Sequence, residues 1–338
     1  MHRQQLQDIQ EFVSDFTDRK PLRGATFLIT GATGLIGSSL IRCLTALNLD
    51  IRIIAPVRNM EKACGMLGRH GDVRFVEGEL EGMDYASLGR ADYVVHCAAP
   101  TASRYFVDHP VETFCSITDI TVRLLDYARD VRPKGFVYLS SLEVYGEIRD
   151  PEAVLTEDCQ GYLNPTRVRS SYPMAKRAAE NLCCLYASQY GVRTMIARLT
   201  QTTGAGISPD DNRIIASFAR STAHGRDIVL HTEGRSARPY CYVTDAVSAL
   251  LAIAVHGETG TAYNVANPDT YISARGMAEW LRDNVNPGIA VRVEPDEGRG
   301  YAPETFHRLD TGRLASLGWR PRYGLDEIFQ RLINYMTK

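Results

Sequence analysis

The chain has 338 residues, of which 44% are hydrophobic and 23% are charged, and its formal net charge is −2. This composition is typical of a soluble globular protein and gives no reason to expect a nucleic acid or an anionic membrane as a partner. A chain of this length is too long to fold around one simple hydrophobic core, which predicts a large domain with a second lobe. The eight cysteines lack metal-ligand spacing, so we expect no metal site, reduced thiols and a cytoplasmic protein.

The first segment, residues 1–20, has apolar side chains at helical spacing. They are Leu6, Ile9, Phe12, Val13 and Phe16. The segment has too few apolar residues for an export signal, and we expect an amphipathic helix that covers the following domain. A membrane-surface or partner helix is the alternative, which the absence of a basic polar face disfavours.

From residue 25 onward, apolar runs typical of buried strands alternate with helical patterns. The expected strands are 25–30, 51–57, 73–78, 92–98, 135–141 and 193–199, with a later strand within 258–267. The expected helices are 35–47, 110–130 and 170–190. Continuous apolar strands that alternate with helices indicate a parallel sheet covered on both faces. The sequence therefore predicts an α/β fold with a doubly wound parallel sheet.

A glycine-rich turn, "TGATGLIG", lies between the first expected strand and the first helix of this sheet. Glycine is needed where the chain turns tightly and where the backbone approaches a ligand closely. The free N–H groups at the start of the following helix suit a diphosphate. We therefore predict a dinucleotide site here, formed by Gly31, Thr33, Gly34, Leu35, Ile36 and Gly37.

The end of the second expected strand, "APVRN", bears on which dinucleotide binds. NAD sites usually have an acidic residue there, which accepts a hydrogen bond from the ribose 2′-hydroxyl. Val57 occupies that position, and Arg58 follows it. Because an arginine can hold a 2′-phosphate, the strand end favours NADP over NAD. The alternative is that Arg58 stacks near the adenine or points to solvent.

A tyrosine and a lysine four residues apart occur in "YPMAK", near the start of the expected helix 170–190. This spacing places Tyr172 and Lys176 on one helix face. We expect the ammonium to lower the pKa of the phenol, which could then exchange a proton with a sugar hydroxyl during hydride transfer. Ser141, at the end of strand 135–141, could bind the same substrate oxygen.

Five motifs together give the sequence a family resemblance. "TGATGLIG", "HCAAP", "SSLEVYG", "YPMAK" and "RPYCYVTD" follow one another as in extended short-chain dehydrogenases/reductases of the NAD-dependent epimerase/dehydratase family. The sequence resembles this family over residues 24–325. The resemblance implies a Rossmann domain, a smaller C-terminal substrate lobe, a nucleotide-sugar substrate, and catalysis by Ser141, Tyr172 and Lys176. It also implies cofactor contacts by Glu79, Leu80, Ala98, Ala99 and Lys176.

The resemblance also predicts how the chain is divided and how it assembles. We expect the Rossmann domain at 1–200 and 236–268 and the substrate lobe at 201–235 and 269–338. Family members often form homodimers through two helices per subunit, which correspond to 111–130 and 172–190 in this sequence.

The carboxylate in "SSLEVYG" indicates which reaction of this family to expect. The 4,6-dehydratases carry Asp-Glu at this place and the UDP-glucuronate decarboxylases carry Ser-Glu, whereas this sequence has Leu142-Glu143. Leu142 cannot donate a proton to a departing hydroxyl, which disfavours dehydration. We expect Glu143 to take a proton at C5 of the sugar or to orient a C5 carboxylate for loss, with a role in orienting loops as the alternative.

Four further residues are expected to contact the substrate. The pattern "RSSYPMAKR" resembles the decarboxylases and makes Arg169 a candidate for a sugar or carboxylate contact, while Arg238 in "RPYCYVTD" corresponds to a diphosphate or carboxylate contact. Ser103 is a third candidate. Gln201 is the fourth, at a place where the family usually has Asn, so this contact is altered.

Three functions remain open at this point. The first is oxidation at C4 of a nucleotide sugar, chemistry at C5 or C6 assisted by Glu143, and reduction. The second is an NADPH-dependent reductase of a keto-sugar nucleotide or sugar phosphate, which Arg58 would suit. The third, a non-catalytic dinucleotide sensor, is disfavoured by the intact Ser141, Tyr172 and Lys176.

Overall fold

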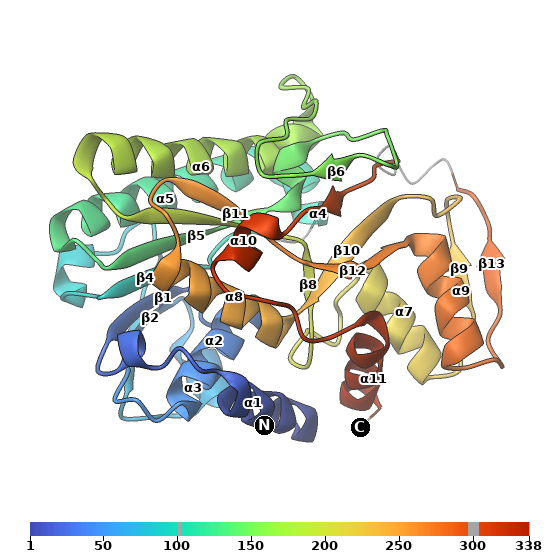
Figure 1. Cartoon of the computed structure of the whole chain (residues 1–338), viewed down its shortest axis with the longest axis horizontal. Helices are drawn as coiled ribbons and strands as arrows, with labels where there is room; N and C mark the ends of the chain where they lie inside the picture. The colour runs from blue at the N-terminus through green and yellow to red at the C-terminus, as the bar shows by residue number, and fades with distance from the viewer. Residues whose placement is uncertain (101–102, 297–303, 338) are drawn as a thin grey trace.

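Seven parallel strands form the central sheet, in the order β3-β2-β1-β4-β5-β7-β11 (Figure 1). They are β1 (Thr26–Thr30), β2 (Arg52–Val57), β3 (Val73–Glu77), β4 (Tyr93–His96), β5 (Gly135–Ser141), β7 (Thr194–Leu199) and β11 (Thr261–Val265). The structure is a computed structural model that describes residues 1–100, 103–296 and 304–337, without the side chains of residues 103 and 104. The predicted doubly wound parallel sheet is confirmed. Its strand order reverses between β1 and β4, where ligands bind in such folds.

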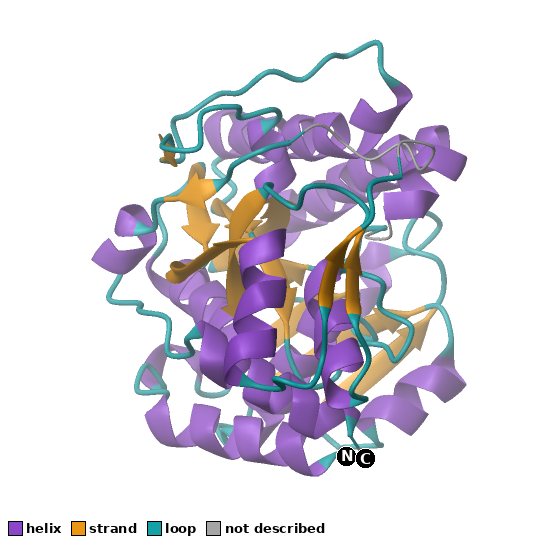
Figure 2. Ribbon diagram, turned by 90° about the vertical axis from the view of Figure 1, so that its right-hand side faces the viewer, coloured by secondary structure: helices purple, strands orange, loops and turns teal. Residues whose placement is uncertain are grey.

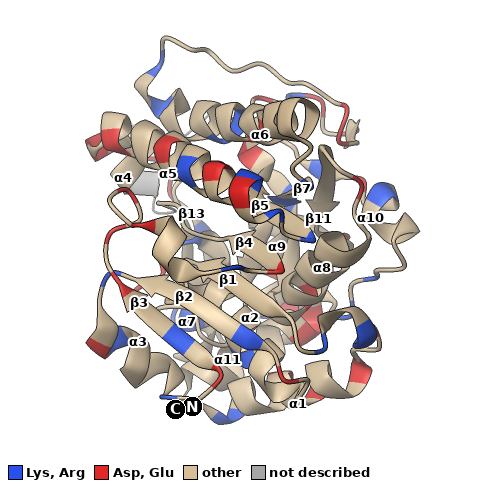
Figure 3. Cartoon of the chain, turned by 90° about the vertical axis from the view of Figure 1, so that its left-hand side faces the viewer, with Lys and Arg blue, Asp and Glu red and all other residues tan. Residues whose placement is uncertain are grey.

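Helices cover both faces of this sheet, and Figure 2 shows them on either side of the strands. On one face lie α5 (Pro110–Val131) and α6 (Ser171–Tyr190), and on the other lie α2 (Leu35–Ala46), α3 (Met60–Leu67) and α8 (Val243–His256). Strands such as β1 and β7 are buried along their whole length because both faces are covered. Figure 3 shows acidic and basic residues interspersed along the outer turns of α5.

A second set of elements lies beyond the carboxyl end of β7. Its strands form a three-stranded sheet of β8 (Gln201–Thr203), β10 (Ala237–Tyr242) and β12 (Asn267–Ser273), and two pairs, β9 (Ile228–Leu230) with β13 (Val291–Val293) and β6 (Val154–Leu155) with β14 (Arg308–Leu309). The remaining helices are α1 (Arg3–Asp15), α4 (Ser103–Asp108), α7 (Ile214–Ala223), α9 (Ala274–Asn284), α10 (Gly312–Ser316) and α11 (Leu325–Met336). Beyond residue 270 the described chain contains short strands as well as helices. The domain boundaries stay predictions.

The first and last helices of the structure are joined by buried ionic groups. Asp8 is only 2% exposed and accepts hydrogen bonds from Tyr242 Oη and Arg331 Nη1, each at 2.6 Å. Glu11 Oε2 accepts from Tyr323 Oη and Arg331 Nη2, each at 2.8 Å. Because a buried charge is stable only with partners, these contacts hold α1 against α11.

None of the helices that the structure describes is long and apolar enough to cross a membrane.

Candidate active site

The glycine turn between β1 and α2 is packed so closely that side chains are excluded at two positions. Gly31 has φ +68°, and a Cβ there would lie 2.9 Å from the backbone nitrogen of Ala98. A Cβ on Gly37 would lie 2.3 Å from Gly31 O. Gly34 is the N-cap of α2 and has no side chain to cap it, so the amides of Leu35 and the next residues lack capping partners. This cradle fits a dinucleotide diphosphate.

The other residues expected to bind the cofactor follow the ends of β3 and β4. The backbone nitrogen of Ala98 donates to Thr30 Oγ1 at 3.2 Å, which holds the segment after β4 beside the glycine turn. Ala99 is half-buried and Glu79 is exposed. Leu80 accepts a hydrogen bond from Tyr85 Oη through its carbonyl at 2.9 Å. Contacts of these residues with the adenine half of the cofactor stay predictions.

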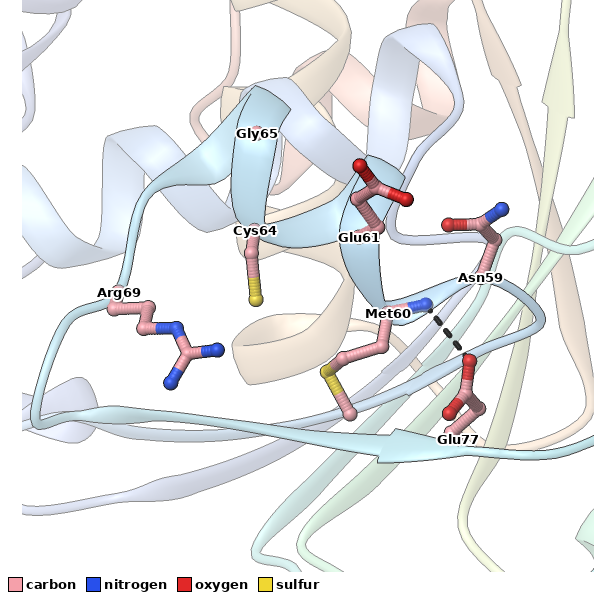
Figure 4. A pocket seen from close by; sticks show the side chains of 7 residues that line it. All are labelled: Asn59, Met60, Glu61, Cys64, Gly65, Arg69 and Glu77. Atoms are coloured by element: carbon pink, nitrogen blue, oxygen red, sulfur yellow. Dashed lines mark hydrogen bonds between the residues drawn. The ribbon is translucent and has the colours of Figure 1, made fainter.

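Arg58 and the start of α3 act in opposite directions on the choice between NAD and NADP. Arg58 is exposed and has no ion-pair partner among the described residues. In the first turn of α3, the backbone nitrogen of Met60 donates to Glu77 Oε1 at 3.0 Å, and that of Lys62 donates to Asn59 Oδ1 at 2.7 Å. Figure 4 shows the Glu77 carboxylate beside this helix end, at one side of a hollow. An anion already placed there repels a further phosphate.

The end of β5 brings Ser141 and Tyr172 together. Ser141 Oγ accepts a hydrogen bond from the backbone nitrogen of Glu143 at 3.2 Å, which starts the short 3₁₀ turn Leu142–Tyr145. Tyr172 lies in the first turn of α6, is 7% exposed, and lies near enough to the Ser141 side chain for Ser141 to lower the pKa of the phenol. The pair can therefore bind one substrate oxygen from two sides.

Lys176 lies one turn further along α6, on the same face. Its Nζ donates to Leu139 O at 2.7 Å and lies 4.8 Å from the ring centroid of Tyr138 and 5.7 Å from that of Tyr172. Burial lowers its pKa to about 8, while Glu180 opposes the shift. The ammonium has three protons and uses one on Leu139, which leaves donors for a ribose hydroxyl.

The expectation that Lys176 lowers the pKa of Tyr172 is wrong for the protein alone. Burial raises the pKa of the Tyr172 phenol, the charge of Glu143 raises it further, and the Ser141 side chain only partly offsets both. Spacing along a helix gives the separation of two residues but not their burial, and burial dominates this phenol.

Glu143 lies within the electrostatic reach of three expected site residues. Its carboxylate is half-buried, and burial raises its pKa, while the guanidinium groups of Arg169 and Arg238 oppose that shift. The same carboxylate raises the pKa of Tyr172. Among the described residues, neither arginine has a carboxylate within ion-pair distance. The site therefore combines a carboxyl group whose pKa is raised by burial with two arginines that have no carboxylate partner among the described residues.

Residues 27–266 match the sequence model of the NAD-dependent epimerase/dehydratase family. The chain belongs to this family. Over 320 residues it is 29% identical to UDP-glucuronic acid decarboxylase 5 of Arabidopsis thaliana, which covers 91% of this chain and 90% of that protein. Over 337 residues it is 26% identical to UDP-glucuronic acid decarboxylase 1 of Xenopus tropicalis, which covers 97% and 74%. The chain is thus an enzyme of a family whose members modify nucleotide sugars.

Solved structures show the same epimerase/dehydratase fold. An epimerase of Methanothermobacter thermautotrophicus matches with a TM-score of 0.79 at 22% identity and covers 98% of this chain and 95% of its own. The UDP-glucuronic acid 4-epimerase of Bacillus cereus, solved with UDP-glucuronic acid and NAD, matches with a TM-score of 0.78 at 18% identity and covers 92% and 98%. At this level of identity the likeness establishes the fold.

Two predicted substrate residues are not joined to the catalytic cluster by any described contact. Gln201 lies in β8 opposite Tyr240, and its side-chain oxygen is buried without a hydrogen-bond partner in the described part of the chain. Ser103 begins α4, but its side chain lies outside the described residues.

Sequence reasoning missed three aromatic or imidazole side chains beside the family's catalytic residues. Phe106 stacks on Tyr172, and no motif marks it. His96 belongs to the quoted motif "HCAAP", and its Nδ1 lies 2.8 Å from Thr30 Oγ1; burial lowers its pKa to about 3, so it is neutral. His307 lies near Arg238, far along the sequence from every quoted motif.

Proposed function

We propose that the chain oxidises C4 of a nucleoside diphosphate uronic acid, removes the C6 carboxylate as CO₂, and then reduces C4. Glu143 is the observation that carries this proposal. A carboxyl group with a raised pKa beside Tyr172 can hold a proton and deliver it near the carbon that is oxidised. A simple reductase would need no such group.

The two unpaired arginines favour a substrate with more than one anionic group. Arg169 and Arg238 both act on Glu143 from nearby and have no carboxylate partner among the described residues. Guanidinium groups bind carboxylates and phosphates through charge-assisted hydrogen bonds. A uronic acid linked to a diphosphate supplies both anions. The relatives named UDP-glucuronic acid decarboxylases agree with this choice.

The residues of the chain divide the proton transfers between them. When bound, the nicotinamide of NAD supplies the hydride chemistry at C4. Tyr172 Oη takes the proton of the C4 hydroxyl, and Ser141 orients that oxygen. In the cofactor-loaded enzyme the Lys176 ammonium, 5.7 Å from the ring centroid of Tyr172, offsets part of the burial that raises the pKa of this phenol in the protein alone. Loss of CO₂ from the 4-keto acid leaves an enolate, and Glu143 gives C5 the proton that replaces the carboxylate. Tyr172 finally returns its proton to the C4 oxygen.

NADPH-dependent reduction of a keto-sugar is the second candidate function. It is favoured by Arg58, an exposed guanidinium after β2 with no ion-pair partner in the part of the chain that the structure describes. It would leave Glu143 and its raised pKa without a chemical role, so we rank it below decarboxylation.

The deciding experiment is an assay with UDP-glucuronic acid on the purified protein. Release of CO₂ and a nucleotide sugar lighter by one carboxyl group, seen by mass spectrometry without added cofactor, is the expected result. Tightly held oxidised NAD that copurifies with the protein would agree with it. Oxidation of added NADPH by a keto-sugar nucleotide without release of CO₂ would contradict the proposal and establish the reductase.

A further inference from the structure

His307 lies between the catalytic turn and the strand that carries Arg238. Its backbone nitrogen donates to Ala237 O at 2.9 Å, which aligns residue 307 with the start of β10. Its side chain is buried, with 4% of the residue exposed, and its Nε2 lies 3.1 Å from Gly146 O. Gly146 ends the 3₁₀ turn that contains Glu143. The imidazole therefore lies at the end of the site that holds Glu143 and Arg238.

The contact with Gly146 determines the tautomer of His307. A carbonyl oxygen only accepts hydrogen bonds, so Nε2 must carry the proton that it donates. Burial and the nearby charge of Arg238 lower the pKa of His307 to about 4, and the ring is neutral near pH 7. Nδ1 therefore has a lone pair and no proton. It is a hydrogen-bond acceptor.

This acceptor has no donor in the described part of the chain. The Nδ1 atom of His307 is fully buried and lacks a hydrogen-bond partner there, although buried polar atoms are nearly always paired. Arg238, whose charge lowers the pKa of the ring, does not fill this role, because no hydrogen bond joins it to Nδ1. The missing donor must come from outside the described protein atoms.

We propose that His307 Nδ1 accepts a hydrogen bond from a hydroxyl group of the bound sugar and is a specificity-determining residue of the site. This rests on the proposed function, which places a sugar between Tyr172 and Arg238. The carboxylate and the phosphates of such a substrate are acceptors and pair with arginines, so they cannot satisfy Nδ1. A sugar hydroxyl is a donor and is present at this end of the substrate.

Two substitutions separate this role from the structural contact with Gly146. In His307→Gln the amide nitrogen takes the place of Nε2 and preserves the donor to Gly146, while the acceptor at Nδ1 is lost. In His307→Asn the amide oxygen takes the place of Nδ1 and preserves the acceptor, while the bond to Gly146 is lost. The surface residue His224, which also contacts a backbone carbonyl, provides the control substitution His224→Gln.

The measurement is calorimetric binding of UDP-glucuronic acid and of UDP to the cofactor-loaded protein. We expect His307→Gln to weaken UDP-glucuronic acid binding by about 3- to 10-fold, the scale of one hydrogen bond, and to leave UDP binding within about 2-fold. We expect His307→Asn to bind UDP-glucuronic acid more tightly than His307→Gln does but to have the lower melting temperature. In steady-state kinetics, His307→Gln should mainly raise KM and change kcat little.

Other outcomes overturn the inference or the proposed function separately. Unchanged binding of UDP-glucuronic acid by His307→Gln overturns the sugar contact, as does an equal loss for UDP, which would place the donor on the nucleotide. If the wild-type protein binds UDP-glucuronic acid and releases no CO₂, the proposed reaction fails while the His307 comparison still decides the contact. If the wild-type protein binds neither ligand, both proposals are wrong.

Discussion

The ring of Phe106 lies parallel to the ring of Tyr172, with the two centroids 4.2 Å apart and the planes inclined by 7°. Phe106 is itself buried in α4, so the stacked pair fixes the plane of the phenol. The Ser141 side chain, at the end of β5, lies near enough to the phenol to lower its pKa. The proton-transferring oxygen is therefore held in place before substrate binds.

Tyr172→Phe tests whether this oxygen takes part in the reaction. The substitution keeps the ring and its stack on Phe106 and removes the group that exchanges the proton. Turnover should fall by about 10²- to 10⁴-fold, as expected for loss of a positioned acid–base group. Binding of NAD, measured by fluorescence, should stay unchanged. Near-normal turnover would contradict the family mechanism in this chain.

Glu143→Gln separates oxidation at C4 from the later steps. The amide has the size of the carboxyl group but cannot deliver a proton to C5. The absorbance of reduced nicotinamide should appear on mixing with UDP-glucuronic acid and then persist, while CO₂ release and net product formation fall. Glu152→Gln, at an exposed position after the same turn, is the matched control and should behave as wild type. Full overall turnover by Glu143→Gln would give this residue a merely structural role.

Arg58→Ala tests the choice of dinucleotide. If Arg58 holds a 2′-phosphate, its removal should weaken NADP binding by about 1.5–3 kcal/mol, the scale of a charge-assisted hydrogen bond, and leave NAD binding unchanged. The carboxylate of Glu77 at the start of α3 acts in the opposite direction, so Glu77→Gln should strengthen NADP binding. Equal losses for both cofactors in Arg58→Ala, or a wild-type preference for NAD, would show that the strand end was misread.

Asp245→Asn should make stability less dependent on pH. Burial raises the pKa of Asp245 to about 6 from 3.8, although the backbone nitrogens of Tyr323 and Arg322 donate to its carboxylate. The folded chain binds the proton of Asp245 more tightly than the unfolded chain does. The contribution of Asp245 to the unfolding free energy therefore falls as the pH rises from 3.8 through about 6. The advantage of the Asn variant should grow by about 1 kcal/mol between about pH 5 and about pH 8.

Denaturant unfolding at the two pH values measures this advantage. Asp210→Asn, at an exposed position, is the control and should show no such change. An advantage of Asp245→Asn that stays constant or shrinks with rising pH would contradict the assigned cause.

Exposed apolar residues on α5 and α6 test the predicted homodimer. Val111 is 68% exposed, Phe114 38% and Leu185 51%, and the two helices pack side by side. If they meet the same helices of a second copy, Phe114→Glu with Leu185→Glu should halve the molar mass measured by light scattering. The control is Val154→Glu, at a residue 53% exposed on β6. A wild-type monomer would contradict the prediction.

The sequence predicted the central sheet well because its signals are local. The runs that became β1, β5 and β7 are continuous and apolar, and a parallel strand buried on both faces needs that pattern. The short strands β9, β13 and β14 have two or three residues each, too few to show a period. These strands are defined only by pairing with partner strands that are distant in the sequence.

The sequence likewise predicted some residues of the site and missed others. Ser141, Glu143, Tyr172 and Lys176 stand in recognisable motifs, and the structure brings them into one cluster. Phe106 and His307 belong to the surroundings of that cluster, yet they reach it through folding alone. Their contacts depend on α4 and β14, and no spacing in the sequence encodes them.

The buried ionic contacts between α1 and α11 have a consequence for the order in which the protein can fold during synthesis. Arg331 leaves the ribosome more than three hundred residues after Asp8 and Glu11. Until then, Asp8 and Glu11 lack the guanidinium of Arg331 that pairs with both of them. The helix can dock in this way only after Arg331 has been made, so its docking must follow the synthesis of the whole central sheet, although α1 precedes that sheet in the sequence.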